Sequence, residues 1–186
     1  MKKNIIIFVF IAKCHILFSQ EENLVVFLAD ATTNSVPVYA NDTSMDCITN
    51  IKEDSIKKNL YDVEILVQSN NRYKVCITSS MDENTSPING WVDKESCGVL
   101  LHGRYVTSDV CIVSLYLIPD QPYPFLEITD KYADGFGEYT NNKAVPVLDY
   151  KLHNGEYWIK TVIIKDNKKI VGWTKDYCPN VFGSCN

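Results

Sequence analysis

The stretches INGWVDKESCGVL (residues 88–100) and IVGWTKDYCPNVFG (residues 170–183) decide the fold of this chain. Each places Gly-Trp after a short β-rich run and before an acidic tail that carries a cysteine, and the two tryptophans lie 82 residues apart. Three pairs of aromatic residues occur in the same order at similar offsets of 82, 85 and 77: Trp91 with Trp173, Tyr73 with Trp158, and Tyr39 with Tyr116. This ordered recurrence predicts a duplicated module of about 80 residues.

The N-terminus has the pattern of a secretory signal peptide. Lys2 and Lys3 precede the apolar run IIIFVFIA, residues 5–12. Such a run after a positive start is typical of an export signal, and it is too short for a membrane-spanning helix, which needs about 20 apolar residues. We predict that residues 1–19 form the signal peptide and that export places the protein in the periplasm or outside the cell.

The cleavage site is predicted after Ser19, which makes Gln20 the first residue of the mature chain. The ending LFSQ resembles signal peptides of Bacteroidetes. The alternative is a lipoprotein anchored at Cys14. That reading is disfavoured because Lys13 stands where lipoprotein processing needs a small residue.

The charge and the cysteines follow from this prediction. Loss of residues 1–19 removes three lysines and no acid, so the net charge falls from −5 to −8. An acidic exported chain is a poor match for nucleic acid or for an anionic membrane surface. Six cysteines remain, an even number that favours disulfides in an oxidising compartment. Zinc is disfavoured because the sequence has no Cys-x-x-Cys spacing and few histidines.

Three disulfides are predicted from the spacing of these cysteines. Cys178 and Cys185 flank a short loop that contains Pro and Gly, so they are expected to pair with each other. A bridge between Cys97, near the end of the first module, and Cys111, at the start of the second, would clamp the linker. Elimination then leaves the pair Cys47–Cys76.

Strand signals dominate the mature chain. β-branched or aromatic runs alternate with polar and Gly- or Pro-containing segments. The segments 62–68 and 72–78 read as a hairpin in which Tyr73, Val75 and Ile77 face the core, and tight turns are expected at 153–155 and 166–168. One weak helical candidate covers residues 55–62. The other predicted strands cover residues 24–29, 36–40, 88–93, 110–118, 124–129, 144–150, 156–164 and 169–174.

This order of motifs resembles bacterial SH3-like domains. In that family a V-x-V-Y strand is followed by a long loop, a W/Y-x-V strand, a short turn and a G-W-V strand. The first copy carries these motifs at 36–39, 73–75 and 90–92, and the second copy carries weaker versions at 158–160 and 172–174. The resemblance implies an all-β chain of two tandem SH3-like small barrels, at residues 24–101 and 109–186, with peptide or cell-wall ligands.

Five aromatic residues are the candidate ligand-binding residues, because Tyr and Trp at such positions can stack on sugars or grip extended peptides while their polar ends stay wet. The alternative is that these rings only close the small cores. The candidates are Tyr39 and Trp91 in the first copy and Tyr116, Tyr123 and Trp173 in the second.

No catalytic pattern stands out in the sequence. The fragments around Cys47 and Cys97 lack the small, apolar helix start that exposes a catalytic thiolate. The acids from 120 to 134 lack the ligand spacing of an EF-hand loop. We therefore expect a non-enzymatic binding module without a cofactor or metal. The alternatives are a structural or assembly protein that docks to other envelope proteins and, less favoured, a cysteine-dependent cell-wall hydrolase.

Overall fold

The computed structural model describes residues 23–28, 35–52, 61–79, 84–107, 110–130 and 145–178. These residues form β-strands and one 3₁₀ turn, and no α-helix occurs among them. The predicted signal peptide, most of the predicted helix at 55–62, and Cys185 lie outside the described residues. Tyr61 and Asp62, the last two residues of that predicted helix, belong to a strand. The all-β prediction is therefore confirmed for the described residues.

The strands are numbered in chain order. The first half contains β1 (Val25–Leu28), β2 (Ser35–Tyr39), β3 (Cys47–Lys52), β4 (Tyr61–Gln68), β5 (Arg72–Ser79), β6 (Ile88–Asp93), the 3₁₀ turn η1 (Lys94–Ser96) and β7 (Cys97–Leu101). The second half contains β8 (Arg104–Thr107), β9 (Val110–Leu115), β10 (Leu126–Asp130), β11 (Val145–Pro146), β12 (Asp149–His153), β13 (Glu156–Lys165), β14 (Lys168–Thr174) and β15 (Tyr177–Cys178).

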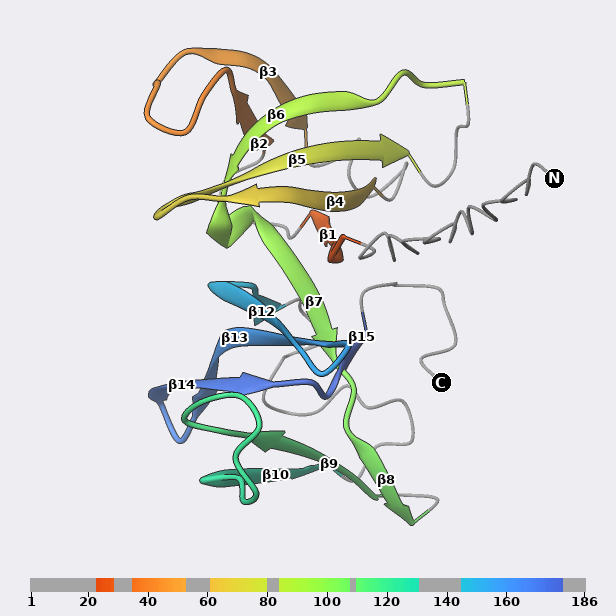
Figure 1. Cartoon of the computed structure of the whole chain (residues 1–186), viewed down its shortest axis with the longest axis vertical. Helices are drawn as coiled ribbons and strands as arrows, with labels where there is room; N and C mark the ends of the chain where they lie inside the picture. The colour runs from red at the N-terminus through yellow and green to blue at the C-terminus, as the bar shows by residue number, and fades with distance from the viewer. Residues whose placement is uncertain are drawn as a thin grey trace, which may run out of the picture.

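The described strands make three antiparallel sheets. The largest has the order β11-β7-β1-β4-β5-β6-β2-β3, with β15 also paired to β7, and the smaller ones have the orders β10-β9-β8 and β12-β13-β14. No sheet closes into a barrel among the described strands. The molecule is elongated, with the first half above the second in Figure 1.

The two halves repeat the same scheme of strand pairing. In each, a hairpin (β2–β3 or β9–β10) precedes a three-stranded meander (β4-β5-β6 or β12-β13-β14). The Gly-Trp strand then meets the Tyr-bearing end of the hairpin, with Tyr39 opposite Trp91 and Tyr116 opposite Trp173. The Tyr-bearing strand and the Gly-Trp strand are therefore neighbours in both halves.

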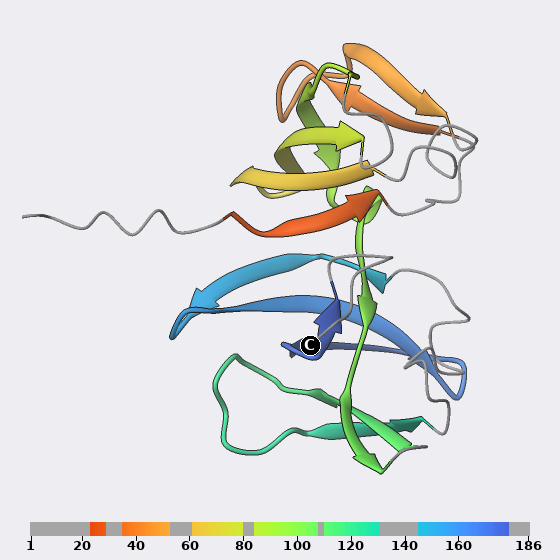
Figure 2. The same cartoon turned by 90° about the vertical axis from the view of Figure 1, so that its right-hand side faces the viewer.

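The strand β7 belongs to both halves. It pairs with β1 of the first half and with β11 and β15 of the second. Figure 2 shows it continuing from the upper group of strands into the lower one. In the first half, β1 lies between β4 and the last strand, β7. In the second half, β7 has the same position between β11 and the last strand, β15.

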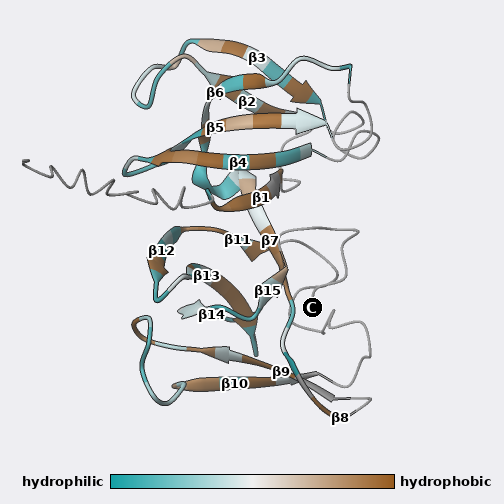
Figure 3. Cartoon of the chain, turned by 45° about the vertical axis from the view of Figure 1, so that its right-hand side comes forward, coloured by the Kyte–Doolittle hydropathy of each residue, from teal (hydrophilic) through white to brown (hydrophobic). Residues whose placement is uncertain are grey.

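Alternation of side chains along the strands builds one core. On β5, Tyr73, Val75 and Ile77 are 0–1% exposed, as the sequence predicts, whereas Lys74 is exposed. Buried residues of both halves form a single cluster that extends from Leu24 to Ile163, and Figure 3 shows hydrophobic segments along the strands of both halves. The phenol of Tyr73 donates a hydrogen bond of 3.0 Å to the Val147 carbonyl and so links the two halves inside the core.

Tight turns form at both predicted positions of the second meander. Asn154 and Gly155 have φ of 53° and 79°, and Asp166 and Asn167 have φ of 51° and 58°. Two consecutive positive φ values are typical of type I′ turns, whose twist matches that of a hairpin. The predicted strand at 144–150 is interrupted, because its residues divide between β11 and β12.

Candidate binding surfaces

The first candidate surface is the outer face of β5 and β6, where Tyr39 and Trp91 meet. Lys74 is opposite Trp91 on one side, and Tyr39 is opposite it on the other. Gly90 points the other way, and a Cβ built there would lie 2.4 Å from Val38 Cγ1. The glycine therefore lets β2 approach β6 closely, which brings the tyrosine beside the tryptophan.

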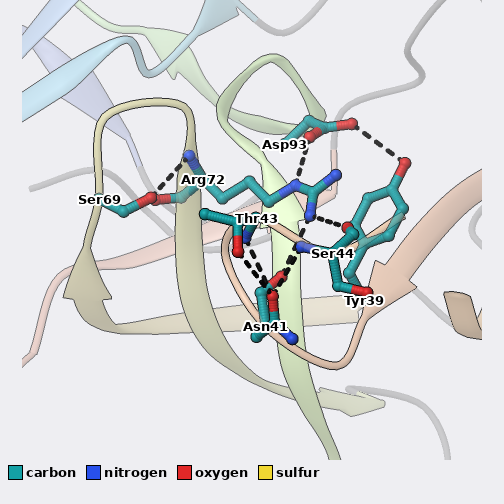
Figure 4. Close-up of polar contacts among 7 residues, drawn as sticks. All are labelled: Tyr39, Asn41, Thr43, Ser44, Ser69, Arg72 and Asp93. Carbon is teal, nitrogen blue, oxygen red and sulfur yellow. Dashed lines mark hydrogen bonds and ion pairs between the residues drawn. The ribbon is translucent and has the colours of Figure 1, made fainter. Parts of the chain in front are cut away.

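Arg72 organises this surface. Its guanidinium carbon lies 3.5 Å from the centroid of the Tyr39 ring, and its Nε donates a hydrogen bond of 2.9 Å to Asp93 Oδ1. One terminal nitrogen donates to the carbonyls of Asn41 and Ser44, at 3.1 and 2.5 Å (Figure 4). The arginine side chain is only 8% exposed, so these contacts satisfy a cation that is largely removed from water.

The loop that contains Asn41 and Ser44, to which Arg72 donates, is also stabilised by its own hydrogen bonds. Asn41 Oδ1 accepts hydrogen bonds from the backbone amides of Thr43 and Ser44, at 3.1 and 2.6 Å. Such bonds are typical of Asx turns. Burial, together with the nearby Asp93 carboxylate, raises the pKa of Tyr39. Tyr39 is 9% exposed, so the ring is held between Arg72 and the strands rather than presented to a ligand.

The second candidate surface contains Tyr116 and Trp173. The two residues exchange backbone hydrogen bonds of 2.8 Å in both directions. Lys151 Nζ lies 5.2 Å from the centroid of the Trp173 ring. Trp173 is 6% exposed and Tyr116 is partly exposed. The indole thus fills the junction between β14 and β9, and its face is not available for stacking on a sugar.

Trp158 and Lys175 take the places that Arg72 and Asp93 have in the first half. Trp158 meets the Tyr116 ring edge-on, with centroids 5.2 Å apart, and Lys175 Nζ lies 5.7 Å from the Trp158 ring centroid. Lys175 also donates a 2.7 Å hydrogen bond to Glu156, which raises the pKa of the lysine. Each half therefore packs a cation against an aromatic ring at this junction, from β5 in the first half and from the residue after β14 in the second.

The strand register corrects one of the sequence pairings. Lys74 is opposite Trp91 and Lys160 is opposite Trp173, so β5 and β13 correspond at an offset of 86 residues. Trp158 then corresponds to Arg72, and the predicted equivalence of Tyr73 and Trp158 is wrong by one residue. Because side chains alternate between faces, that single step puts Tyr73 in the core and Trp158 on the outer face.

The connection between β9 and β10 exposes apolar side chains. The Phe125 amide donates a 2.9 Å hydrogen bond to the Leu115 carbonyl and closes the base of this connection. Beyond that base, Leu117, Ile118 and Tyr123 are 64%, 58% and 81% exposed. This short connection, directly after Tyr116, thus presents three apolar or aromatic side chains to solvent.

A hydrogen bond joins this connection to the adjacent meander. Asp120 Oδ2 lies 2.9 Å from His153 Nε2, at the end of β12. Asp120 has a φ of 64°, the left-handed conformation that Asp tolerates better than most residues. The exposed apolar residues thus lie on a connection that is anchored at Phe125 and at Asp120.

The predicted site residues therefore form two separate groups. Tyr39 meets Trp91 in the first half, and Tyr116 meets Trp173 in the second, with Tyr123 on the connection that follows Tyr116. Sequence reasoning missed Arg72, Asp93, Trp158 and Lys175. The signal that would have found them is the cross-strand register, which puts Arg72 opposite Asp93, two residues beyond Trp91.

Two of the predicted disulfides are absent from the structure. Cys47, Cys76 and Cys97 carry free thiols, so the pairs Cys47–Cys76 and Cys97–Cys111 are not formed. Cys47 is on β3 and Cys76 is on β5, and β6 and β2 lie between those strands, so the two residues are too far apart in the sheet. Cys178 is disulfide-bonded; its pairing with Cys185 stays a prediction, because Cys185 lies outside the described residues.

The thiol of Cys97 is poorly placed to act as a nucleophile. Cys97 is fully buried on β7, and burial raises the pKa of its thiol. A buried thiol with a raised pKa holds its proton and is a poor nucleophile. Over the described ranges, no three His, Cys, Asp or Glu side chains gather in a way that could hold a metal ion. No helix in those ranges is long and apolar enough to cross a membrane.

Comparisons with known proteins give no relative for this chain: no family model, no curated protein and no solved structure matches it.

Proposed function

We propose that this protein is a non-catalytic binding protein, secreted or periplasmic after removal of a signal peptide, built from two SH3-like modules and directed at a peptide or cell-wall ligand. Two features support the SH3-like reading. The Tyr-bearing strand lies beside the Gly-Trp strand in both halves, and the two halves share their order of strand pairing.

One observation carries the binding proposal. The β9–β10 connection presents Leu117, Ile118 and Tyr123 to solvent, while its base is fixed by a hydrogen bond and its middle by the contact of Asp120 with His153. Apolar and aromatic side chains on an anchored loop give contact area at a low cost in conformational entropy. The hydrogen-bonded Tyr116–Trp173 pair holds the start of this loop and is a positioning element, whereas Tyr123 makes the contact.

A second candidate function is docking to another envelope protein. The exposure of Leu117, Ile118 and Tyr123 on one short connection favours it, since exposed apolar side chains that gather on a surface often mark protein interaction sites. In this case the occupant would be a folded protein surface rather than an extended peptide or a glycan strand. The two candidate functions use the same residues and differ in the kind of partner that these residues bind.

The test compares Tyr123→Ala with Met45→Ala. Both side chains are 81% exposed, and Met45 lies in the first half, so it is a matched control. Retention is measured by co-sedimentation with purified peptidoglycan sacculi and, separately, by capture of peptides from a digest of envelope proteins. We expect Tyr123→Ala to lose retention in one of these assays and Met45→Ala to keep it, with the thermal midpoints of both variants unchanged.

The outcomes separate the candidates. Loss of sacculus or peptide retention supports the ligand-binding function. If Tyr123→Ala affects neither assay but abolishes capture of an intact envelope protein, the docking function replaces it. Equal behaviour of Tyr123→Ala and Met45→Ala in every assay contradicts both.

A further inference from the structure

The outer face of the β12-β13-β14 sheet carries exposed lysines and aliphatic residues. Opposite residues on β13 and β14 form three rungs on this face: Lys160 with Trp173, Val162 with Val171, and Ile164 with Lys169. Ile164 and Val171 are 57% and 45% exposed. The alternate residues Ile159, Thr161 and Ile163 point into the core.

This sheet is basic in an acidic protein. From Asp149 to Lys175 there are six lysines and three acids, a net charge of +3, whereas the whole chain has a net charge of −5. Among the described residues Lys160 and Lys169 form no ion pair, while Lys175 is paired with Glu156. The unpaired ammonium groups therefore lie beside exposed aliphatic side chains on one face.

The sheet face is continuous with the binding surface of the second half. Lys160 is opposite Trp173, and Lys151 lies over the Trp173 ring. The Trp173 backbone is hydrogen-bonded to that of Tyr116, the residue before the exposed connection. His153, at the end of β12, contacts Asp120 on that connection. One ligand that lies across the sheet can thus reach both the lysines and the apolar connection.

The chemistry of this face favours an acidic polypeptide. Valine and isoleucine side chains between lysines suit an extended chain whose residues alternate between carboxylates and apolar groups. Sugar rings need exposed aromatic faces, and Trp158 and Trp173 are only 4% and 6% exposed.

We propose that the outer face of β12, β13 and β14 binds an acidic, extended polypeptide segment, with Lys160 and Lys169 holding its carboxylates and Val171 and Ile164 contacting its apolar residues. The inference rests on the proposed binding function and names the class of ligand.

The experiment compares two pairs of substitutions on one hairpin. Lys160→Gln with Lys169→Gln removes two charges from the outer face. Lys165→Gln with Lys168→Gln removes two charges from the same hairpin on the opposite face, since these residues alternate with the outer-face positions. Binding of the purified full chain is titrated with a short synthetic peptide of alternating Glu and Val. Two surface ion pairs correspond to an affinity loss of about 2- to 30-fold.

We expect the outer-face pair to weaken binding of the Glu-Val peptide within that range, and the opposite-face pair to leave it unchanged. Equal weakening by both pairs, no binding by the native chain, or tighter binding to phosphatidylglycerol vesicles or to polygalacturonate would overturn the inference. If Tyr123→Ala still loses retention in the sacculus or peptide assay while the Glu-Val peptide does not bind, the binding function stands and only the acidic ligand is wrong.

Discussion

Replacement of Arg72 by alanine is expected to destabilise the first half by about 2–4 kcal/mol. The side chain donates to one carboxylate and two carbonyls and stacks on Tyr39, and it is only 8% exposed. Hydrogen bonds to charged groups contribute about 1.5–3 kcal/mol and a desolvated cation–π contact about 2 kcal/mol. Asp93 is 46% exposed and recovers hydration, so the loss stays below the sum of these contributions.

The assay is urea unfolding followed by tryptophan fluorescence. Lys74→Ala is the matched control, because Lys74 lies on the same strand and the same face but is exposed, so its loss is expected to change stability by at most about 0.5 kcal/mol. Arg72→Lys keeps the charge but not the planar fork, and it should recover less than half of the loss. A change for Arg72→Ala no larger than that for Lys74→Ala would refute the role given to this arginine.

Three further predictions concern other parts of the chain. Gly90→Ala is expected to cost about 1–3 kcal/mol, and more than Gly172→Ala, because the added Cβ meets Val38 Cγ1 at 2.4 Å, whereas at Gly172 the nearest atoms are at 3.1 Å; thermal midpoints of the two variants decide it. Burial raises the pKa of Asp176 against the opposing hydrogen bond from the Ser114 amide. The folded state then holds this proton more tightly than the unfolded chain does, so the native protein should lose stability as pH rises from the ordinary carboxyl pKa through the raised one. Asp176→Asn should flatten that slope in unfolding curves measured across this window, and an unchanged slope would contradict the prediction. Maleimide labelling of the native protein, followed by peptide mapping, should modify Cys47 quickly and leave Cys97 unmodified until the chain unfolds; rapid labelling of Cys97 would show that β7 is accessible.

Much of the strand content is predictable from the sequence because it depends on local alternation. Tyr73, Val75 and Ile77 are recognisable as core residues because they alternate with Arg72, Lys74 and Thr78, which are polar or charged. Tyr39 and Trp91 are recognisable as candidates of one module from the motif order, whereas their adjacency is seen only in the strand pairing.

The side-chain contacts at each candidate surface depend on the register between neighbouring strands. The alternation of residues within one strand does not determine that register. Arg72 is recognisable as a buried, stacked cation only once β5 is aligned with β6 and with the loop at Asn41 and Ser44. The predicted pair Cys47–Cys76 failed for the same reason. Elimination left these two cysteines to each other, but the sheet order separates their strands.

The position of β7 has a consequence for how the protein responds to unfolding and to changes in length. This strand completes the first half and begins the second, so neither half can unfold as an independent domain. Denaturation should therefore show one transition rather than two. Truncation after Leu101 would remove β11 and β15, so that β7 would keep its pairing with β1 and lose its pairing with the second half. If further repeats followed this arrangement, each new repeat would share one strand with the repeat before it. Backbone hydrogen bonds to that shared strand, and not linkers, would then join the repeats.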